Sequence, residues 1–391
     1  MGVQKSQKAR IPKRFYFITA LFYVPAFFVL ALLHARWYGW LWTGLSFCLL
    51  LWLRSNRVWR GLNITLCFAL VFCVALNGIY AARPQKEVSF TGQLGRELLR
   101  LVLRLPVEAN AHLDQALDEK ERWQPAEGYL CQTVHLSQSK LELLWAEKSE
   151  SQYAVLQLHG GAFEGGLINV YRSFAQRYGE MIQGGMVATL DYRLWPAHGY
   201  PAQQQDTLEA WRYLTETLQF APERIIVVGD SAGGNLALTL GLHLRDSGEP
   251  MPGAIICMSP WADLSNSGPS HITNATVDPT FGVPAEFYDG TPVGVSTTYT
   301  QGWDTKNPYM SPSFGDYKGF PQMLLQAAGT EVLLSDSQMV YENARKNGVD
   351  CHFTIYEGLF HVFQASLDLI PESRTAWGEI NAFIQSVMDE K

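Results

Sequence analysis

A serine between two glycines offers the clearest chemistry in this sequence. Ser231 lies in Gly229-Asp-Ser-Ala-Gly233, directly after a run rich in Ile and Val and directly before a segment with helical periodicity. A serine on such a tight strand-to-helix turn projects its hydroxyl above the sheet, and glycines at the second position on either side avoid steric collision. The start of the helix also favours a developing oxyanion. The pattern predicts that Ser231 is a nucleophile.

A second glycine pair lies earlier in the chain, in His-Gly-Gly-Ala-Phe beginning at His159. Consecutive glycines let the backbone approach a substrate and direct amide hydrogens toward it. We expect an oxyanion hole with the amides of Gly161, Ala162 and Ala232 as donors, and with Gly160 shaping the loop. His159 is tied to this turn, so we interpret it as bracing the loop rather than as a base.

A nucleophilic serine needs a general base, and histidine has a suitable pKa. In the serine, acid, histidine order of such sites, the base follows the serine in the chain. Outside the helix predicted over residues 232–245, three histidines do so: His271, His352 and His361. His271 falls in an irregular region and His352 inside a predicted strand, whereas His361 follows the last predicted strand. His361 is therefore the predicted base.

The acid is expected after the strand predicted over residues 323–328. Glu331 comes at the end of that strand, where a carboxylate can point into the site, and Asp336 comes five residues later at a predicted helix start. A carboxylate in the first turn of a helix is also common for stability alone. Glu331 is the favoured acid and Asp336 the alternative. The acid holds the histidine tautomer, a role open to glutamate or aspartate.

The elements that must position these residues alternate along the chain. Strands and helices at this spacing predict an α/β fold, a mostly parallel sheet flanked by helices. Residues 264–319 break the alternation and are rich in Gly, Pro, Ser and Thr, which predicts a partial cap inserted over the site. The predicted strands cover residues 129–136, 141–147, 153–159, 186–192, 224–229, 254–259, 323–328 and 351–356; the predicted helices cover residues 170–182, 201–218, 232–245, 335–346 and 373–388.

The N-terminal part of the chain has a different composition. Residues 15–33, 37–53 and 61–80 carry no charged side chain, and about 20 apolar residues are enough to cross a bilayer. We predict N-terminal transmembrane helices in a membrane region over residues 1–90, followed by a catalytic domain over residues 91–391. The second stretch is short enough to be interfacial or re-entrant instead. An amphipathic helix is expected near residues 93–105, on the membrane, over the site or packed on the domain.

Basic residues bear on the orientation of these segments. They cluster before the first stretch and between the second and third, which predicts that those segments are cytoplasmic and that the catalytic domain lies across the membrane, in a lumen. Asn274-Ala-Thr276 is a glycosylation sequon that would suit a lumenal domain.

Charge and cysteine content exclude several classes. The formal net charge is −7, and the body of the chain has no basic cluster of the kind that nucleic acid requires. The six cysteines are widely spread and show no disulfide framework and no metal-binding spacing. We expect no metal, no cofactor and no nucleic-acid partner.

The motifs together resemble the hormone-sensitive-lipase group of α/β hydrolases. The shared segments begin at His159, Asp191, Gly229, Ser259, Asn307 and Glu331, and His361 completes them. The resemblance implies an α/β-hydrolase fold and places the triad carboxylate at Glu331. Two positions depart from the usual pattern: Ala162 replaces a glycine, and Glu331 replaces the commoner aspartate. A membrane segment ahead of such a domain is similar to fungal steryl acetyl hydrolases and arylacetamide deacetylases, which implies deacetylation of apolar acetate esters at the endoplasmic reticulum.

The sequence thus predicts a membrane-anchored serine carboxylesterase whose partners are a small lipophilic ester and the lipid bilayer. An amidase, lactonase or acyltransferase could use the same side chains. A non-catalytic ligand receptor on the same fold is a further alternative, although such a protein would be expected to lose a member of the triad.

Overall fold

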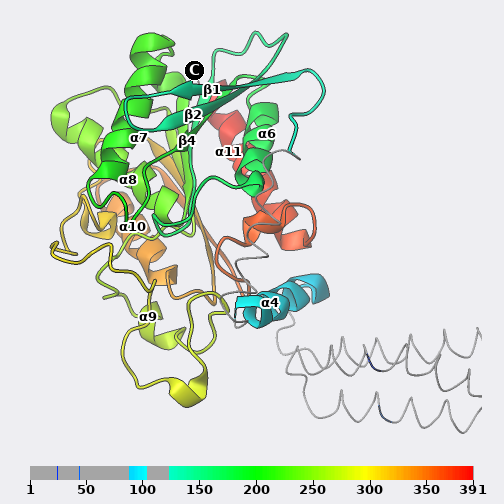
Figure 1. Ribbon diagram of the computed structural model, residues 1–391, viewed down its shortest axis with the longest axis vertical. Helices are drawn as coiled ribbons and strands as arrows, with labels where there is room; N and C mark the ends of the chain where they lie inside the picture. The colour runs from blue at the N-terminus through cyan, green and yellow to red at the C-terminus, as the bar shows by residue number, and fades with distance from the viewer. Residues whose placement is uncertain (1–23, 25–43, 45–87, 104–122, 391) are drawn as a thin grey trace, which may run out of the picture. The chain divides into compact units, whose positions relative to one another are not determined.

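The computed structural model describes residues 24, 44, 88–103 and 123–390 (Figure 1). Apart from residues 24 and 44, the predicted spans 15–33, 37–53 and 61–80 lie outside the described residues, so the transmembrane helices stay a prediction. Within the described ranges, every helix is too short or too polar to cross a bilayer. The chain divides into two units, residues 1–98 and 99–391, and the helix predicted near residues 93–105 is present as α4 (Phe90–Leu103).

The second unit is built on one eight-stranded sheet in the order β1-β2-β4-β3-β5-β6-β7-β8. β1 and β2 are antiparallel to their neighbours, and the other pairings are parallel. The predicted α/β fold with a mostly parallel sheet is therefore confirmed. The strands are β1 (Tyr129–His135), β2 (Lys140–Ala146), β3 (Ala154–Leu158), β4 (Met186–Asp191), β5 (Ile225–Asp230), β6 (Ala254–Met258), β7 (Gln322–Ala328) and β8 (Cys351–Tyr356).

Helices cover both faces of the sheet (Figure 1). The helices α6 (Asn169–Met181) and α11 (Pro371–Asp389) pack on one face, and α7 (Ala202–Arg212), α8 (Ala232–Ser247) and α10 (Leu334–Lys346) pack on the other. Successive strand residues point to opposite faces, so β5 buries Ile226 with the first set and Val227 with the second. A strand that is apolar at every position, as β5 nearly is, can only be stable when covered on both sides.

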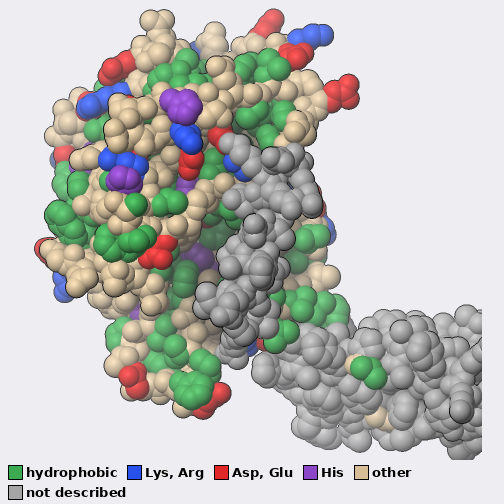
Figure 2. Space-filling model, viewed as in Figure 1, with side chains coloured by type: hydrophobic (Ala, Val, Ile, Leu, Met, Phe, Trp, Pro, Cys, Tyr) green, Lys and Arg blue, Asp and Glu red, His purple; other side chains and the backbone are tan. Residues whose placement is uncertain are grey.

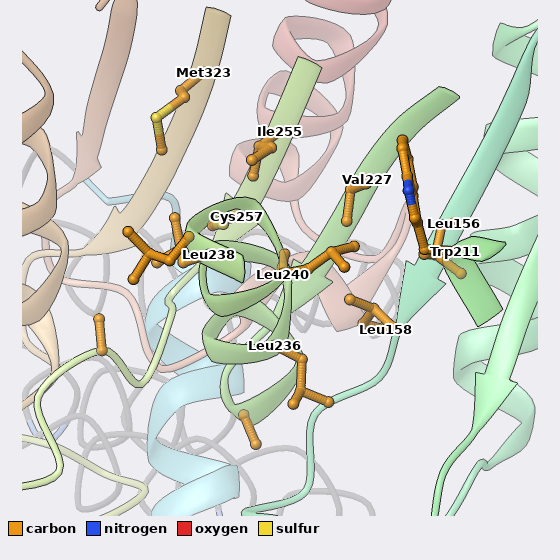
Figure 3. Packing of buried hydrophobic residues seen from close by; sticks show 14 of the residues in the cluster. Leu156, Leu158, Trp211, Val227, Leu236, Leu238, Leu240, Ile255, Cys257 and Met323 are labelled. Carbon is orange, nitrogen blue, oxygen red and sulfur yellow. The ribbon is translucent and has the colours of Figure 1, made fainter. Parts of the chain in front are cut away.

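The core under α8 shows how closely this layer is packed. Leu236, Leu238 and Leu240 from the helix meet strand residues such as Val227 and Ile255 (Figure 3). Each buried side chain of this size contributes about 1.5–3 kcal/mol relative to an exposed one. The helix that begins directly after Ser231 is thus packed firmly against the strand that ends directly before it.

Residues 264–319, predicted to form a partial cap, lie between β6 and β7 and are called the insertion below. The insertion contains α9 (Ser270–Thr273) and the short 3₁₀ turns Ala285–Phe287 and Pro312–Phe314. Hydrophobic side chains appear on the lobe that carries α9 (Figures 1 and 2). The exposed ones include Ile272, Val277 and Phe287.

Candidate active site

Ser231 occupies the sharp turn between β5 and α8. Its backbone has φ 52° and ψ −120°, a combination that non-glycine residues adopt only when the surrounding structure enforces it. A Cβ atom at Gly229 would lie 2.2 Å from the carbonyl oxygen of Gly233, and one at Gly233 would lie 2.0 Å from that of Leu158. Both glycines are required for the turn, as the sequence pattern predicts.

The predicted acid and base meet at the same edge of the sheet. Nδ1 of His361 lies 2.6 Å from Oε2 of Glu331, and the Glu331 side chain is completely buried. β5, β6, β7 and β8 are parallel neighbours, so the loops at their carboxyl ends lie side by side. This order brings residues 331 and 361 to the edge where Ser231 lies.

The second oxygen of Glu331 is also fixed. Oε1 accepts hydrogen bonds from the Ser259 hydroxyl, at 2.9 Å, and from the Ala328 amide, at 2.8 Å. The Ser259 hydroxyl in turn accepts from the amide of Val362, at 3.3 Å. Ser259 therefore joins the acid to the residue that follows the base, a role that the sequence analysis missed.

The ring of His361 packs edge-on against Phe281, with centroids 4.8 Å apart. Burial lowers the pKa of His361, but the hydrogen bond and charge of Glu331, together with the charges of Asp278 and Asp230, outweigh burial and raise it. Within the described part of the chain, the ring forms no hydrogen bond with Ser231, and only its Nδ1 is paired. Such contacts are often long in the absence of substrate and shorten when substrate binds. Nε2 remains available.

The loop after β3 adopts the conformation that its glycines allow. Gly161 has φ 110° and Ala162 has φ 56°. The Gly160 amide donates to Oδ1 of Asp230 at 3.2 Å, so Gly160 shapes the loop and its amide is already used. No acceptor among the described residues pairs with the amides of Gly161, Ala162 or Ala232, the three expected oxyanion donors.

Asp230 and His159 help to fix this loop, the first by hydrogen bonds and the second by ring stacking. Asp230 also accepts from the Tyr171 hydroxyl at 3.2 Å, and burial, partly offset by His361, Tyr171 and Gly160, raises its pKa to about 7. His159 stacks on Tyr192 with ring centroids 4.1 Å apart, and burial lowers its pKa to about 4. A buried, neutral ring packed in this way agrees with a bracing role.

Asp336, the alternative acid, belongs to a different pair. Its Oδ1 lies 2.9 Å from Nε2 of His271, and its Oδ2 accepts from the amides of Ala262 and Asp263. Nδ1 of His271 is bonded to the carbonyl oxygen of Val293 at 2.8 Å. Both side chains are completely buried. No local pattern could have predicted this pair, because its members are 65 residues apart.

The side-chain amide of the sequon residue Asn274 is hydrogen-bonded within the fold. Its Nδ2 donates to the carbonyl oxygens of Glu331 and Gly329, at 2.8 and 3.1 Å. A glycan on this nitrogen would replace one of the two donated hydrogens. Glycosylation at this sequon stays a prediction. Across residues 88–103 and 123–390, no group of three or more His, Cys, Asp or Glu side chains could hold a metal ion.

Comparison with known proteins agrees with this fold. A family model for the alpha/beta hydrolase fold matches residues 155–365. An acetyl-hydrolase of Streptomyces hygroscopicus is 34% identical over 60% of this chain and 76% of its own length. An esterase of Acinetobacter venetianus is 32% identical over 76% of this chain and 96% of its own length. A crystal structure of an esterase from the bacterial hormone-sensitive lipase family has a TM-score of 0.64 and is 28% identical, covering 76% of this chain and 98% of the other.

The fold and the match together define the class: the chain belongs to the α/β-hydrolase family. Within that family it is similar to the hormone-sensitive-lipase group, as the motifs that begin at His159 and Gly229 predict. The predicted resemblance and the predicted hydrolase class are both confirmed.

Proposed function

We propose that this chain is a carboxylester hydrolase in which Ser231, His361 and Glu331 form the catalytic triad. The observation that carries the proposal is the 2.6 Å contact between His361 and the buried Glu331 carboxylate, at the sheet edge where Ser231 occupies a strained turn. The esterase and acetyl-hydrolase relatives support ester hydrolysis as the reaction.

The residues divide the reaction between them as follows. Nε2 of His361 takes the hydroxyl proton of Ser231 while the serine oxygen attacks the ester carbonyl carbon. The amides of Gly161, Ala162 and Ala232 stabilise the oxyanion. The protonated His361 then gives its proton to the leaving alcohol, and a water molecule activated by the same ring releases the acid from Ser231. Glu331 holds Nδ1–H throughout, so Nε2 stays free to accept a proton.

We further propose that the acyl group is short, with acetyl as the first candidate. One relative is named an acetyl-hydrolase, and the methyl group of Ala162 stands in the oxyanion loop, where a glycine is usual. The alcohol portion is proposed to be lipophilic, because the charge-free stretches near the N-terminus suit a chain that works beside a bilayer.

The test is an assay of the purified full chain on p-nitrophenyl esters of increasing acyl length, with Ser231→Ala as the control. We expect the highest kcat/KM for acetate and loss of turnover in Ser231→Ala. Activity that survives this substitution would refute the mechanism, and a preference for long acyl chains would refute the acetyl proposal alone.

The N-terminal stretches support a separate proposal about location. We propose that residues 1–90 anchor the chain in a membrane, with the catalytic domain on the lumenal side of the endoplasmic reticulum. Extraction of membranes with alkaline carbonate and protease protection of sealed vesicles test it. Release of the chain by carbonate would argue against the anchor, and digestion of the catalytic domain in sealed vesicles would argue against the orientation.

A further inference from the structure

The insertion bonds directly to the loop that carries Glu331. Asn274 donates to the carbonyl oxygens of Gly329 and Glu331. Four residues later, Oδ2 of Asp278 accepts from the amide of Val332 at 2.7 Å. The backbone on both sides of the Glu331 side chain is therefore held by two side chains from the insertion.

The same short segment also contacts the base. Oδ1 of Asp278 accepts from the amides of Thr280, at 2.7 Å, and Phe281, at 3.2 Å. These bonds fix the backbone that presents the Phe281 ring to His361, at 4.8 Å between ring centroids. Residues 274–281 thus connect the acid loop to the histidine ring.

The acid loop has few strong bonds of its own. Its internal backbone bonds, from Glu331 to Ala328 and from Leu334 to Glu331, are both 3.3 Å long, which is beyond the usual range for a peptide hydrogen bond. The contacts from Asn274 and Asp278 are shorter, at 2.7 to 2.8 Å for the closest of each. The insertion therefore adds two short contacts to those that Ser259, Tyr356 and Leu359 make with this loop.

We propose that Asn274 and Asp278 are positioning residues of the triad: they fix the Glu331 loop so that its carboxylate stays on Nδ1 of His361. The inference rests on the proposed function, in which Glu331 is the acid and His361 the base. It gives the insertion a part in the reaction, since displacement of a reacting group by even 1 Å can cost about a hundredfold in rate.

The proposal predicts a change in the pH profile that a purely structural role would not cause. The carboxylates that face His361 are Glu331, Asp278 and Asp230, and all three raise its pKa. Since His361 must be neutral to take a proton, kcat/KM rises with pH through this pKa. Loosening the Glu331 loop weakens the largest of these interactions, so the acid limb of the profile should move to lower pH while kcat falls.

The experiment compares Asn274→Ala, Asp278→Asn and Thr276→Ala in the full chain. Thr276→Ala is the matched control, because it removes the sequon and leaves the Asn274 side chain in place. We expect both positioning variants to lower kcat about ten- to a hundredfold with little change in KM. The diagnostic shift of the acid limb to lower pH is expected in Asn274→Ala, which removes no charge, because Asp278→Asn also removes a charge that itself raises the pKa of His361. Thr276→Ala should match the unaltered chain in both respects. Circular dichroism at the assay temperature shows that each variant is folded.

Two results would overturn the inference. One is unchanged kcat and an unchanged acid limb in Asn274→Ala and Asp278→Asn. The other is a lower thermal midpoint with the pH profile unmoved, which would mean that the contacts only stabilise the fold. Ser231→Ala distinguishes a failure of the proposed function from a failure of this inference. If Ser231→Ala is still active, the proposed function fails. If Ser231→Ala is inactive and the positioning variants are normal, only this inference fails.

Discussion

This molecule contains two histidine–carboxylate pairs, and they differ in which ring nitrogens they leave unbonded. His361 meets Glu331 at 2.6 Å and His271 meets Asp336 at 2.9 Å. In the described part of the chain, His361 is bonded only through Nδ1, whereas His271 is bonded through both ring nitrogens. A base needs a free nitrogen, so only the first pair can accept a proton from Ser231. The second pair is suited to hold the insertion in place.

The tautomers of the two rings follow from their partners. The carbonyl oxygen of Val293 can only accept, so Nδ1 of His271 must carry a hydrogen. In the neutral ring, Nε2 of His271 is then an acceptor. In the other pair, Nδ1 of His361 must carry the hydrogen if Nε2 is to accept from Ser231. The same substitution, a carboxylate changed to its amide, should therefore have opposite consequences in the two pairs.

The largest effect is expected for Glu331→Gln. A Gln side chain that donates to Nδ1 of His361 forces the hydrogen onto Nε2, and the ring can no longer take the proton of Ser231. We expect kcat to fall about 10³- to 10⁴-fold with the fold retained, as measured by steady-state hydrolysis of p-nitrophenyl acetate. Asp336→Asn is the matched control and should lose less than about tenfold. The reverse ranking would assign the triad acid to Asp336.

Loss of the second pair should appear in stability. Asp336→Ala removes the acceptor of the amides of Ala262 and Asp263 and leaves Nε2 of His271 buried without a partner. We expect the free energy of unfolding to fall by about 3–5 kcal/mol, measured by urea denaturation of the full chain in detergent. Asp336→Asn keeps an oxygen for both amides and a donor for Nε2 of His271, so it should recover most of the loss. Equal losses in the two variants would contradict this account of the bonding.

The sequence predicted the sheet more completely than the insertion. β8 has the bounds that its pattern predicts, and the other strands agree within two residues, because each strand is apolar for reasons of burial that its own residues reveal. The helix predicted over residues 201–218 has the right position, but it changes to a π-helix over Tyr213–Thr217. A period of 3.6 residues does not reveal where one residue is added to a turn.

The site residues also divide into those that the sequence predicted and those that it did not. Ser231, Glu331 and His361 could be singled out because each follows a recognisable strand and because the Gly-x-Ser-x-Gly spacing reflects steric limits at one turn. Asn274 and His271 could not, since their partners lie 57 and 65 residues away across an aperiodic segment. The sequon at Asn274 did not reveal these bonds, because a sequon describes three neighbouring residues and not the use of the amide in the fold.

The smallest effect is expected in how the stability contribution of the His271–Asp336 pair changes with pH. Burial lowers the pKa of His271, but Asp336, together with Val293 and Asp263, outweighs burial and raises this pKa above its usual value. Burial raises the pKa of Asp336 to about 6, even after the opposing effect of His271. Both shifts are upward, so the folded chain holds more protons here than the unfolded chain.

The sign of the stability change follows from these shifts. The contribution of His271 is fully present below its unfolded pKa, about 6.5, and is lost as pH rises through the higher folded value. The stability contribution of Asp336 is lost as pH rises from the unfolded pKa of this carboxyl through its folded pKa of about 6. The Asn side chain of Asp336→Asn cannot bind the proton that the Asp336–His271 pair gains on folding. Its amide N–H would also repel a charged His271 at low pH. The stability advantage of the unaltered chain over Asp336→Asn should therefore be larger at pH 5 than at pH 9. Urea denaturation across this range measures it, and an advantage that grows with pH would show that the two pKa values are lowered instead.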